Sequence, residues 1–393
     1  MNLHEAKRPV LVFGAGIHQG HAEKEARELA ELLQIPVCLT WGAADLLPES
    51  NALRIGTFGT HGTRAANFAV QNADFILSIG CRLDTTATGT PAKWFAREAH
   101  IVMVDIDLSE IQKMEKVGVK VQAQTHDAAF YMNGLKAALA EFPLPKDFED
   151  WLAQCQSWKQ RYPAVLPEYE KEDEVNPYVL IRELSRLAKP GDIIVCDTGC
   201  AIAWTCQAWE FKEGQRLLHP WNQTPMGYAL PGAIGAYYAT GKRVICITGD
   251  GALMMGIAEL ATIAGHNLPI KIVLLENGGH AMCRQSQREW LGGTYPSTSI
   301  DGGLRFPQFE IVARAHGIES FNIELNEECD AAFEEMLGDD EPCFVEAHIS
   351  PDADVMPKVQ AGKPNEDAYP YLPRETLRDE MIVDVVSASG VVA

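Results

Sequence analysis

The stretch from Arg243 to Leu260, RVICITGDGALMMGIAEL, contains the change of pattern that decides the fold. Its first residues form an apolar run, and its last residues have the apolar spacing of a helix. Between the two patterns, Asp250 stands between Gly249 and Gly251. A short buried strand that leads directly into a helix is typical of a parallel α/β sheet, in which ligands bind at the carboxyl ends of the strands. We therefore expect a ligand at this turn.

The same alternation of strand and helix occurs in both halves of the chain. The clearest apolar runs are PVLVFGAG (9–16), ADFILSIG (73–80), HIVMVDID (100–107), GDIIVCDTG (191–199) and PIKIVLLENGG (269–279). A helix expected near 148–161 is followed by a linker rich in Glu and Pro. We therefore predict an α/β protein with two domains of parallel sheets covered by helices, at residues 1–165 and 166–350, and a C-terminal tail at 351–393.

Composition narrows the possible classes of function. The net charge of −21 repels phosphate backbones and anionic lipid, so nucleic acid and membrane surfaces are not expected partners. No apolar run approaches the roughly 20 residues that a membrane-spanning helix needs, and the first residues, MNLHEAKRPV, contain no apolar signal core. The ten cysteines are scattered without a CxxC pair, which indicates reduced thiols and predicts a cytoplasmic protein.

The GDG turn can be interpreted in two ways. Its glycines allow a tight turn, and free amides at the start of the following helix suit a phosphate. The carboxylate of Asp250 would repel that phosphate unless a cation such as Mg²⁺ lay between them. The alternative is a plain turn in which Asp250 caps the helix.

A second polar residue favours the metal interpretation. Asn277 ends the next expected strand, in LLENGGHAM. A helix and a strand between them bring Asp250 and Asn277 to the same edge of the sheet. A carboxylate, an amide oxygen and a backbone carbonyl from the following glycines would form half of a Mg²⁺ coordination shell.

These motifs resemble those of a known family. GDG, a helix and NLPIKIVLLEN (267–277) resemble the signature of thiamin-diphosphate enzymes, and MGYALPGAIGA (226–236) resembles the acetolactate synthase branch. In the first half, PVLVFGAG and GTHGTRAANFAVQNADFILSIGCRLD (59–84) resemble the middle domain of that branch. The resemblance covers about residues 8 to 350. It implies a middle domain followed by a pyrophosphate-binding domain.

The resemblance also implies roles for particular residues. Asp250 and Asn277 would bind Mg²⁺ through their side chains and Gly279 through its carbonyl, while Met226 would support the thiazolium ring and force the cofactor into a bent shape. Met282 would face the substrate. The remaining implied cofactor contacts are Gly227, Tyr228, Gly249, Gly251 and Ala252.

The chain departs from the family pattern in three respects. Glu276 replaces the first of two paired asparagines, which places an added carboxylate near the expected metal. The segment 198–207 is apolar where relatives carry Gln and His near the diphosphate. The chain also begins at the middle domain, without the pyrimidine-binding domain whose glutamate protonates the aminopyrimidine ring. We therefore expect a separate pyrimidine-domain subunit, in a homodimer or heterotetramer; the alternative is that this sequence is a fragment of a longer chain.

The expected function is that of one subunit of a split enzyme that acts on a 2-oxoacid, with carboligation favoured. The alternatives are a 2-oxoacid decarboxylase subunit and a non-catalytic subunit that binds the cofactor or regulates a partner. FAD is possible, because the family's flavin contacts match Gly14 to Gly16, Thr60 to Gly62 and Arg82 to Asp84. A nicotinamide-dependent dehydrogenase would rest on the first of these segments alone. His61 and His280 are acid–base candidates, with a structural role as the alternative.

Overall fold

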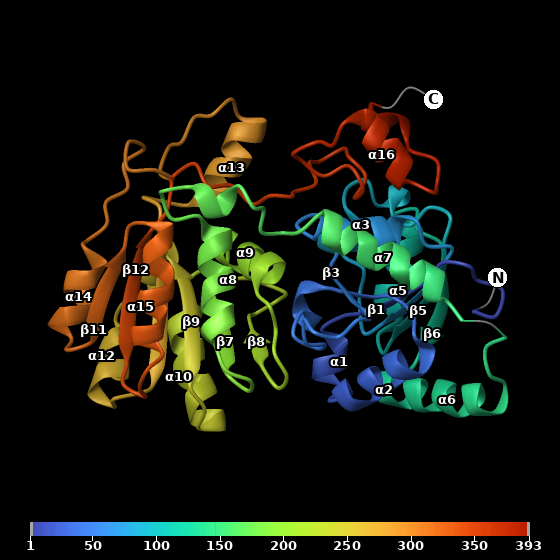
Figure 1. Cartoon of the computed structure of the whole chain (residues 1–393), viewed down its shortest axis with the longest axis horizontal. Coiled ribbons are helices and arrows are strands. Elements are labelled where there is room, and N and C mark those ends of the chain that lie inside the picture. Colours follow the sequence, from blue (N-terminus) through green and yellow to red (C-terminus); the bar gives the residue numbers. More distant parts are fainter. Residues whose placement is uncertain (1–2, 146, 391–393) are drawn as a thin grey trace. The chain divides into compact units, whose positions relative to one another are not determined.

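The computed structural model describes residues 3–145 and 147–390. These residues form two compact units: unit 1 comprises Met1–Ala164 and Met356–Ala393, and unit 2 comprises Val165–Val355. Each unit contains a parallel sheet covered by helices, so the predicted fold class is confirmed (Figure 1). From Met356 onward, the segment that was expected to form a tail clusters with unit 1.

The sheet of unit 1 has the strand order β3-β2-β1-β4-β5-β6, and all of its strands are parallel. Its strands are β1 (Pro9–Phe13), β2 (Val37–Leu39), β3 (Arg54–Thr57), β4 (Phe75–Ile79), β5 (His100–Asp105) and β6 (Val121–Thr125). Its helices are α1 (Gly16–Gln19), α2 (Glu23–Leu33), α3 (Arg64–Gln71), α4 (Thr85–Thr88), α5 (Leu108–Lys116), α6 (Ala128–Glu141), α7 (Glu149–Arg161) and α16 (Arg374–Glu380), with 3₁₀ turns η1 (Trp41–Ala43), η2 (Ala92–Trp94) and η5 (Ser387–Ser389). This strand order is that of a doubly wound dinucleotide-binding sheet.

Alternate residues of β1 enter two different cores in unit 1. Val10 and Val12 join the cluster that contains residues of α3, α5, α7 and α16. Leu11 and Phe13 join the cluster on the other face, which contains residues of α2 and α6. Because side chains alternate along a strand, a continuous apolar run is what a sheet covered on both faces requires.

The C-terminal segment is anchored to unit 1 by a buried carboxylate. Glu380, at the end of α16, is 7% exposed. Its carboxylate accepts hydrogen bonds from Trp158 Nε1 (2.7 Å), the Tyr162 hydroxyl (2.7 Å) and Arg161 Nη2 (2.9 Å). Helix α7, which precedes the linker, therefore packs against residues that follow unit 2 in the sequence.

The sheet of unit 2 has the strand order β11-β12-β10-β9-β7-β8 and is also parallel. Its strands are β7 (Ile193–Cys196), β8 (Arg216–Leu218), β9 (Val244–Gly249), β10 (Ile270–Glu276), β11 (Glu319–Ile323) and β12 (Cys343–His348). Its helices are α8 (Pro177–Leu187), α9 (Cys200–Ala208), α10 (Ala229–Thr240), α11 (Asp250–Gly256), α12 (Glu259–Gly265), α13 (Ala281–Trp290), α14 (Phe309–Ala315) and α15 (Cys329–Met336), with η3 (Tyr169–Lys171) and η4 (Asn326–Glu328).

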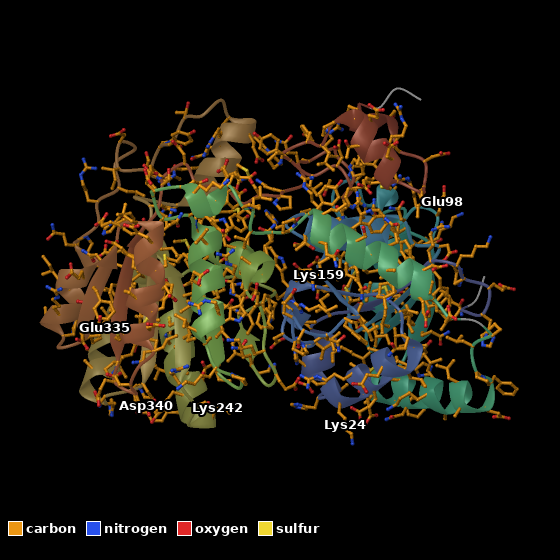
Figure 2. The ribbon with its side chains drawn as sticks, viewed as in Figure 1. Lys24, Glu98, Lys159, Lys242, Glu335 and Asp340 are labelled. Atoms are coloured by element: carbon orange, nitrogen blue, oxygen red, sulfur yellow. The ribbon has the colours of Figure 1, made fainter. Side chains whose placement is uncertain are left out.

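The two edges of this sheet differ in character. Lys242 and Asp340, two exposed charged residues that precede β9 and β12, lie at the amino-terminal edge (Figure 2). Helix α11 begins directly after β9, and α13 begins after the short loop 277–280 that follows β10, so both start on the side of the carboxyl edge. The strand order reverses between β7 and β9, and the carboxyl edge at such a reversal is where doubly wound sheets bind ligands.

Two further observations concern membrane-spanning helices and the state of the cysteines. Among the described residues, none of the helices combines the length and the apolar character that a membrane span requires. All ten cysteines are free thiols, and nine of them are buried.

Candidate functional site

A cavity of about 190 Å³ opens at the carboxyl edge of the sheet in unit 2. Its walls come from the residues that follow β7, β9 and β10, together with Met226. Since the strand order reverses between β7 and β9, the cavity lies where the topology of the sheet predicts a ligand.

The cavity brings together most of the residues expected from the sequence. Its lining includes Met226, Gly249, Asp250, Gly251, Ala252, Asn277, Gly279 and Met282. Gly227 and Tyr228 are not among the lining residues. Their backbone amides donate hydrogen bonds to the carboxylate of Asp197, at 3.0 and 3.3 Å.

Asp250 is a buried carboxylate held by backbone amides. It is 1% exposed and accepts hydrogen bonds from the amides of Gly251 (2.5 Å), Asn277 (3.2 Å) and Gly279 (2.8 Å). Burial raises the pKa of Asp250 to about 6, against the opposing effect of these amides, and the nearby charge of Glu276 adds to the rise. A bound divalent cation would offset the cost of burying this negative charge.

Asn277 has an acceptor that no described residue satisfies. It lines the cavity, and its Oδ1 is buried without a hydrogen-bond partner. Buried polar atoms in native proteins are nearly always paired, so an orphaned amide oxygen beside a carboxylate fits a site for an oxygen-binding cation. The donor set therefore fits Mg²⁺.

The backbone of the loop after β10 is fixed by its neighbours. Arg284 Nη2 donates to the carbonyls of Asn277 (3.1 Å) and Pro351 (2.9 Å). Gly279 has a φ of +154°, and a Cβ built there would lie 2.2 Å from the carbonyl oxygen of Thr298. Only glycine fits at this position, which explains the second glycine of the pair that follows Asn277.

The described residues contain no group of three or more His, Cys, Asp or Glu side chains that could hold a metal ion. A cation at Asp250 and Asn277 would therefore need further oxygen ligands, from backbone carbonyls and from a bound anion.

His280 forms part of the cavity wall, where sequence reasoning left its role open. Its ring packs against Gly251, because a Cβ built on that glycine would lie 2.3 Å from His280 Cε1. Burial, and next the positive charge of Arg284, lower the pKa of His280, which favours the neutral imidazole. His61 belongs to unit 1 and is not a lining residue.

Glu276 does not line the cavity. Its carboxylate accepts hydrogen bonds from the Gly278 amide (2.9 Å) and from His348 Nδ1 (3.1 Å). The added carboxylate acts on Asp250 through its charge, which raises the pKa of Asp250 less than burial does.

The segment after β7 forms an apolar wall with few polar side chains. Thr198, Cys200, Ala201 and Trp204 line the cavity. Cys200 and Trp204 belong to the segment 198–207, which the resemblance placed near the diphosphate without naming single residues, whereas Cys283 is a lining residue for which the sequence gave no signal. Asp197 was also missed, although an aspartate directly after a buried strand was a usable signal.

The glycines of the GAG segment in unit 1 have a packing role. A Cβ on Gly14 would lie 2.4 Å from the Gly80 carbonyl oxygen, and one on Gly16 would lie 2.7 Å from Gly80 Cα. The close approach of the chain after β1 to the chain after β4 accounts for both glycines. No observation supports the FAD that these glycines left possible.

Comparison with protein families identifies both units. The family "Thiamine pyrophosphate enzyme, C-terminal TPP binding domain" matches residues 197–347, and "Thiamine pyrophosphate enzyme, central domain" matches residues 2–130. The chain belongs to the thiamine pyrophosphate enzyme family, and the resemblance drawn from its motifs is confirmed.

Its curated relatives include several acetolactate synthases. It is 34% identical over 367 residues to the acetolactate synthase large subunit of Corynebacterium glutamicum, covering 92% of this chain and 58% of that protein. It is 31% identical over 366 residues to the acetolactate synthase isozyme 1 large subunit of Escherichia coli K12, covering 92% and 62% of the two chains. The large subunit from Lactococcus lactis is 31% identical over 363 residues, with coverage of 91% and 60%. The chain thus spans about 60% of the length of these relatives.

Proposed function

We propose that this chain is a subunit of a thiamin-diphosphate- and Mg²⁺-dependent enzyme that acts on a 2-oxoacid by acetolactate-synthase-like carboligation. One observation carries the proposal: Asp250, whose carboxylate is buried, and Asn277, whose buried Oδ1 has no partner, line the same cavity. That cavity lies within the segment matched by a thiamine-pyrophosphate-binding domain.

In this proposal the side chains of Asp250 and Asn277 and the carbonyl of Gly279 bind Mg²⁺. Gly249 forms the turn, and the amides of Gly251 and Ala252 bind the diphosphate. Electrostatic fit supports these roles, because the metal would neutralise both the diphosphate and the buried carboxylate. The bound cofactor would supply the nucleophilic carbon and the electron sink that allow a 2-oxoacid to lose CO₂ and its remainder to join a second carbonyl compound.

The two methionines would shape the apolar part of the site. Met226 Cε lies 3.2 Å from the Cβ position of Gly251, so this side chain reaches the start of α11. Met282 lines the cavity on the side of α13. We propose that Met226 supports the bent cofactor, with backbone contacts from Gly227 and Tyr228, and that Met282 faces the substrate.

The glutamate that completes the chemistry would come from a separate pyrimidine-domain chain. Among the described residues that line the cavity, Asp250 is the one carboxylate, and metal binding would occupy it. A cavity of about 190 Å³ is also smaller than the usual cofactor site of roughly 300–1,000 Å³, which agrees with a further wall supplied by a partner. The assembly would be a homodimer or heterotetramer, and the free cysteines agree with a cytoplasmic location.

Cofactor binding and turnover test separate parts of this proposal. The chain alone should show a rise in melting temperature with thiamin diphosphate and Mg²⁺ together, and a much smaller rise when EDTA removes the metal. Its consumption of pyruvate should stay at background until a pyrimidine-domain protein is added. Rapid turnover by the chain alone would refute the split arrangement, and absence of any thermal shift would refute the cofactor assignment. Product analysis then separates acetolactate from acetaldehyde, and so carboligation from decarboxylation.

A further inference from the structure

Asp197 is a fully buried carboxylate outside the cavity lining that organises the segment next to Met226. It follows β7 directly and is 0% exposed. Its Oδ1 accepts hydrogen bonds from the amides of Gly227 (3.0 Å) and Tyr228 (3.3 Å), and its Oδ2 accepts one from the amide of Ala229 (3.3 Å). One side chain thus holds three successive backbone amides that lie about thirty residues away in the sequence.

These amides are the ones that the local sequence leaves without an acceptor. Helix α10 begins at Ala229, and its N-cap residue, Tyr228, forms no side-chain capping hydrogen bond. The first amides of a helix need acceptors, and a carboxylate there also interacts favourably with the helix dipole. Asp197, which directly follows β7, therefore caps helix α10 although the two are far apart in the sequence.

The same carboxylate reaches the strand that carries Asp250. Thr248 Oγ1 donates to Asp197 Oδ2 at 3.1 Å, and the Asp197 amide donates to the Ile247 carbonyl at 2.9 Å. Both partners lie in β9, just before Asp250. Asp197 thus ties the segment after Met226 to the strand end that begins the expected metal site.

The backbone of this segment has little freedom to shift. Gly227 has a φ of +81°, and a Cβ built there would lie 2.7 Å from Met255 Cβ in α11. The carboxylate of Asp197 binds the backbone amides of this segment, and Met255 of α11 packs against Gly227. Because Met226 is the residue before Gly227, its place in the cavity depends on both contacts.

We propose that Asp197 is a positioning residue, which sets Met226 against the strand end of Asp250 so that the cavity accepts the thiamin part of the cofactor as well as its diphosphate. The inference rests on the function proposed above. It predicts that loss of the carboxylate affects recognition of the thiamin part and leaves the Mg²⁺-diphosphate part intact.

Two ligands distinguish recognition of the thiamin part from recognition of the diphosphate. Calorimetry on the full chain with Mg²⁺ would compare thiamin diphosphate with inorganic pyrophosphate, which lacks the thiamin part. In Asp197→Asn the amide nitrogen cannot accept a hydrogen bond, and the charge is lost. We expect affinity for thiamin diphosphate to fall about tenfold or more, since hydrogen bonds to charged groups contribute substantially, while affinity for pyrophosphate changes less than about twofold.

Met226→Ala provides the coupling test. It should reproduce the selective loss, and Asp197→Asn combined with Met226→Ala should lose less than the sum of the two single variants, because Asp197 acts through Met226. Thr248→Val removes the hydroxyl that meets Asp197, whereas Thr248→Ser keeps it. If Asp197→Asn does not fold, the affinities for thiamin diphosphate and pyrophosphate are compared between Thr248→Val and Thr248→Ser instead.

Each possible result of these titrations either supports or overturns the inference. Equal losses for both ligands would indicate a general structural role and overturn it, as would unchanged affinity for thiamin diphosphate or additive losses in the double variant. If the unmodified chain binds pyrophosphate but not thiamin diphosphate, or binds neither ligand, the proposed function fails first and this inference fails with it. Selective, non-additive loss supports it.

Discussion

The carboxylate of Asp250 accepts a hydrogen bond from the backbone amide of Asn277 at 3.2 Å, while the side-chain oxygen of Asn277 is buried without a partner. The two residues follow neighbouring strands, β9 and β10, in which Gly249 pairs with Leu275. The carboxylate of Asp250 thus holds the loop that contains Asn277, and both residues line the same cavity. This arrangement leads to the first prediction.

Asp250→Asn and Asn277→Ala should each weaken Mg²⁺-dependent binding of thiamin diphosphate by roughly 100-fold, because each removes one expected metal ligand. Calorimetric titration at fixed Mg²⁺, repeated with EDTA, measures the loss. Unchanged affinity in both variants would show that the cavity binds its ligand without these oxygens.

Glu276→Gln is the matched control. It changes a carboxylate next to Asn277 whose hydrogen bonds go to Gly278 and His348. Binding should therefore stay within about threefold of the unmodified chain, because the variant loses a nearby charge but none of the expected metal ligands.

Gly251→Ala should destabilise unit 2 by about 1–3 kcal/mol, because the new methyl group would overlap the His280 ring. His280→Ala opens that space. The double variant should therefore recover most of the stability, with a coupling energy of about 1 kcal/mol or more in urea unfolding. Additive effects would show that the ring moves aside freely.

The stability of unit 1 should fall between pH 6.5 and about pH 4 because of His61. Burial, and next the charge of Lys358, lower the pKa of His61 to about 4, whereas the unfolded chain takes up this proton near pH 6.5. Below pH 6.5 the unfolded state thus binds more protons, so this contribution is complete at pH 7 and is lost as the pH falls.

Protonation of His61 lowers the free energy of unfolding by at most about 3 kcal/mol, and His61→Gln should not show this decrease. Urea midpoints at pH 7 and pH 5 measure the difference between the two proteins. His126→Gln, at an exposed histidine of the same unit, should retain the pH dependence of the unmodified chain. Identical pH profiles for His61→Gln and the unmodified chain would contradict the prediction.

Glu380→Ala should destabilise unit 1 by about 3 kcal/mol, because it leaves Trp158, Tyr162 and Arg161 without their shared acceptor. Limited proteolysis should then cleave the segment after Met356 faster. Asp379→Ala removes the same charge from an exposed neighbour and should change stability by less than about 0.5 kcal/mol. Equal effects of the two variants would count against a buried anchor.

The central strands could be predicted from the sequence, and the edge strands could not. Strands β1, β4, β9 and β10 are buried on both faces, so each is a continuous apolar run. The edges of the two sheets are β3, β6, β8 and β11. In β6, VQAQT, and β11, ESFNI, polar residues interrupt the pattern because the faces of these two edge strands are only partly covered.

In the site, too, some features could be predicted from the sequence and others could not. Asp250 and Asn277 could be placed together because each directly follows a central strand, and parallel topology brings neighbouring strand ends to one edge. The role of Asp197 depends on contact with Gly227 to Ala229, and no periodicity in the sequence encodes that contact. The inward packing of His280 likewise depends on the missing side chain of Gly251.

Because unit 2 is inserted between two segments of unit 1, the order of synthesis imposes an order on folding. A ribosome makes residues 165–355 before it makes Glu380, so Trp158 is synthesised long before the carboxylate that accepts its hydrogen bond. Nascent unit 1 therefore exposes part of α7 throughout the time in which unit 2 is translated.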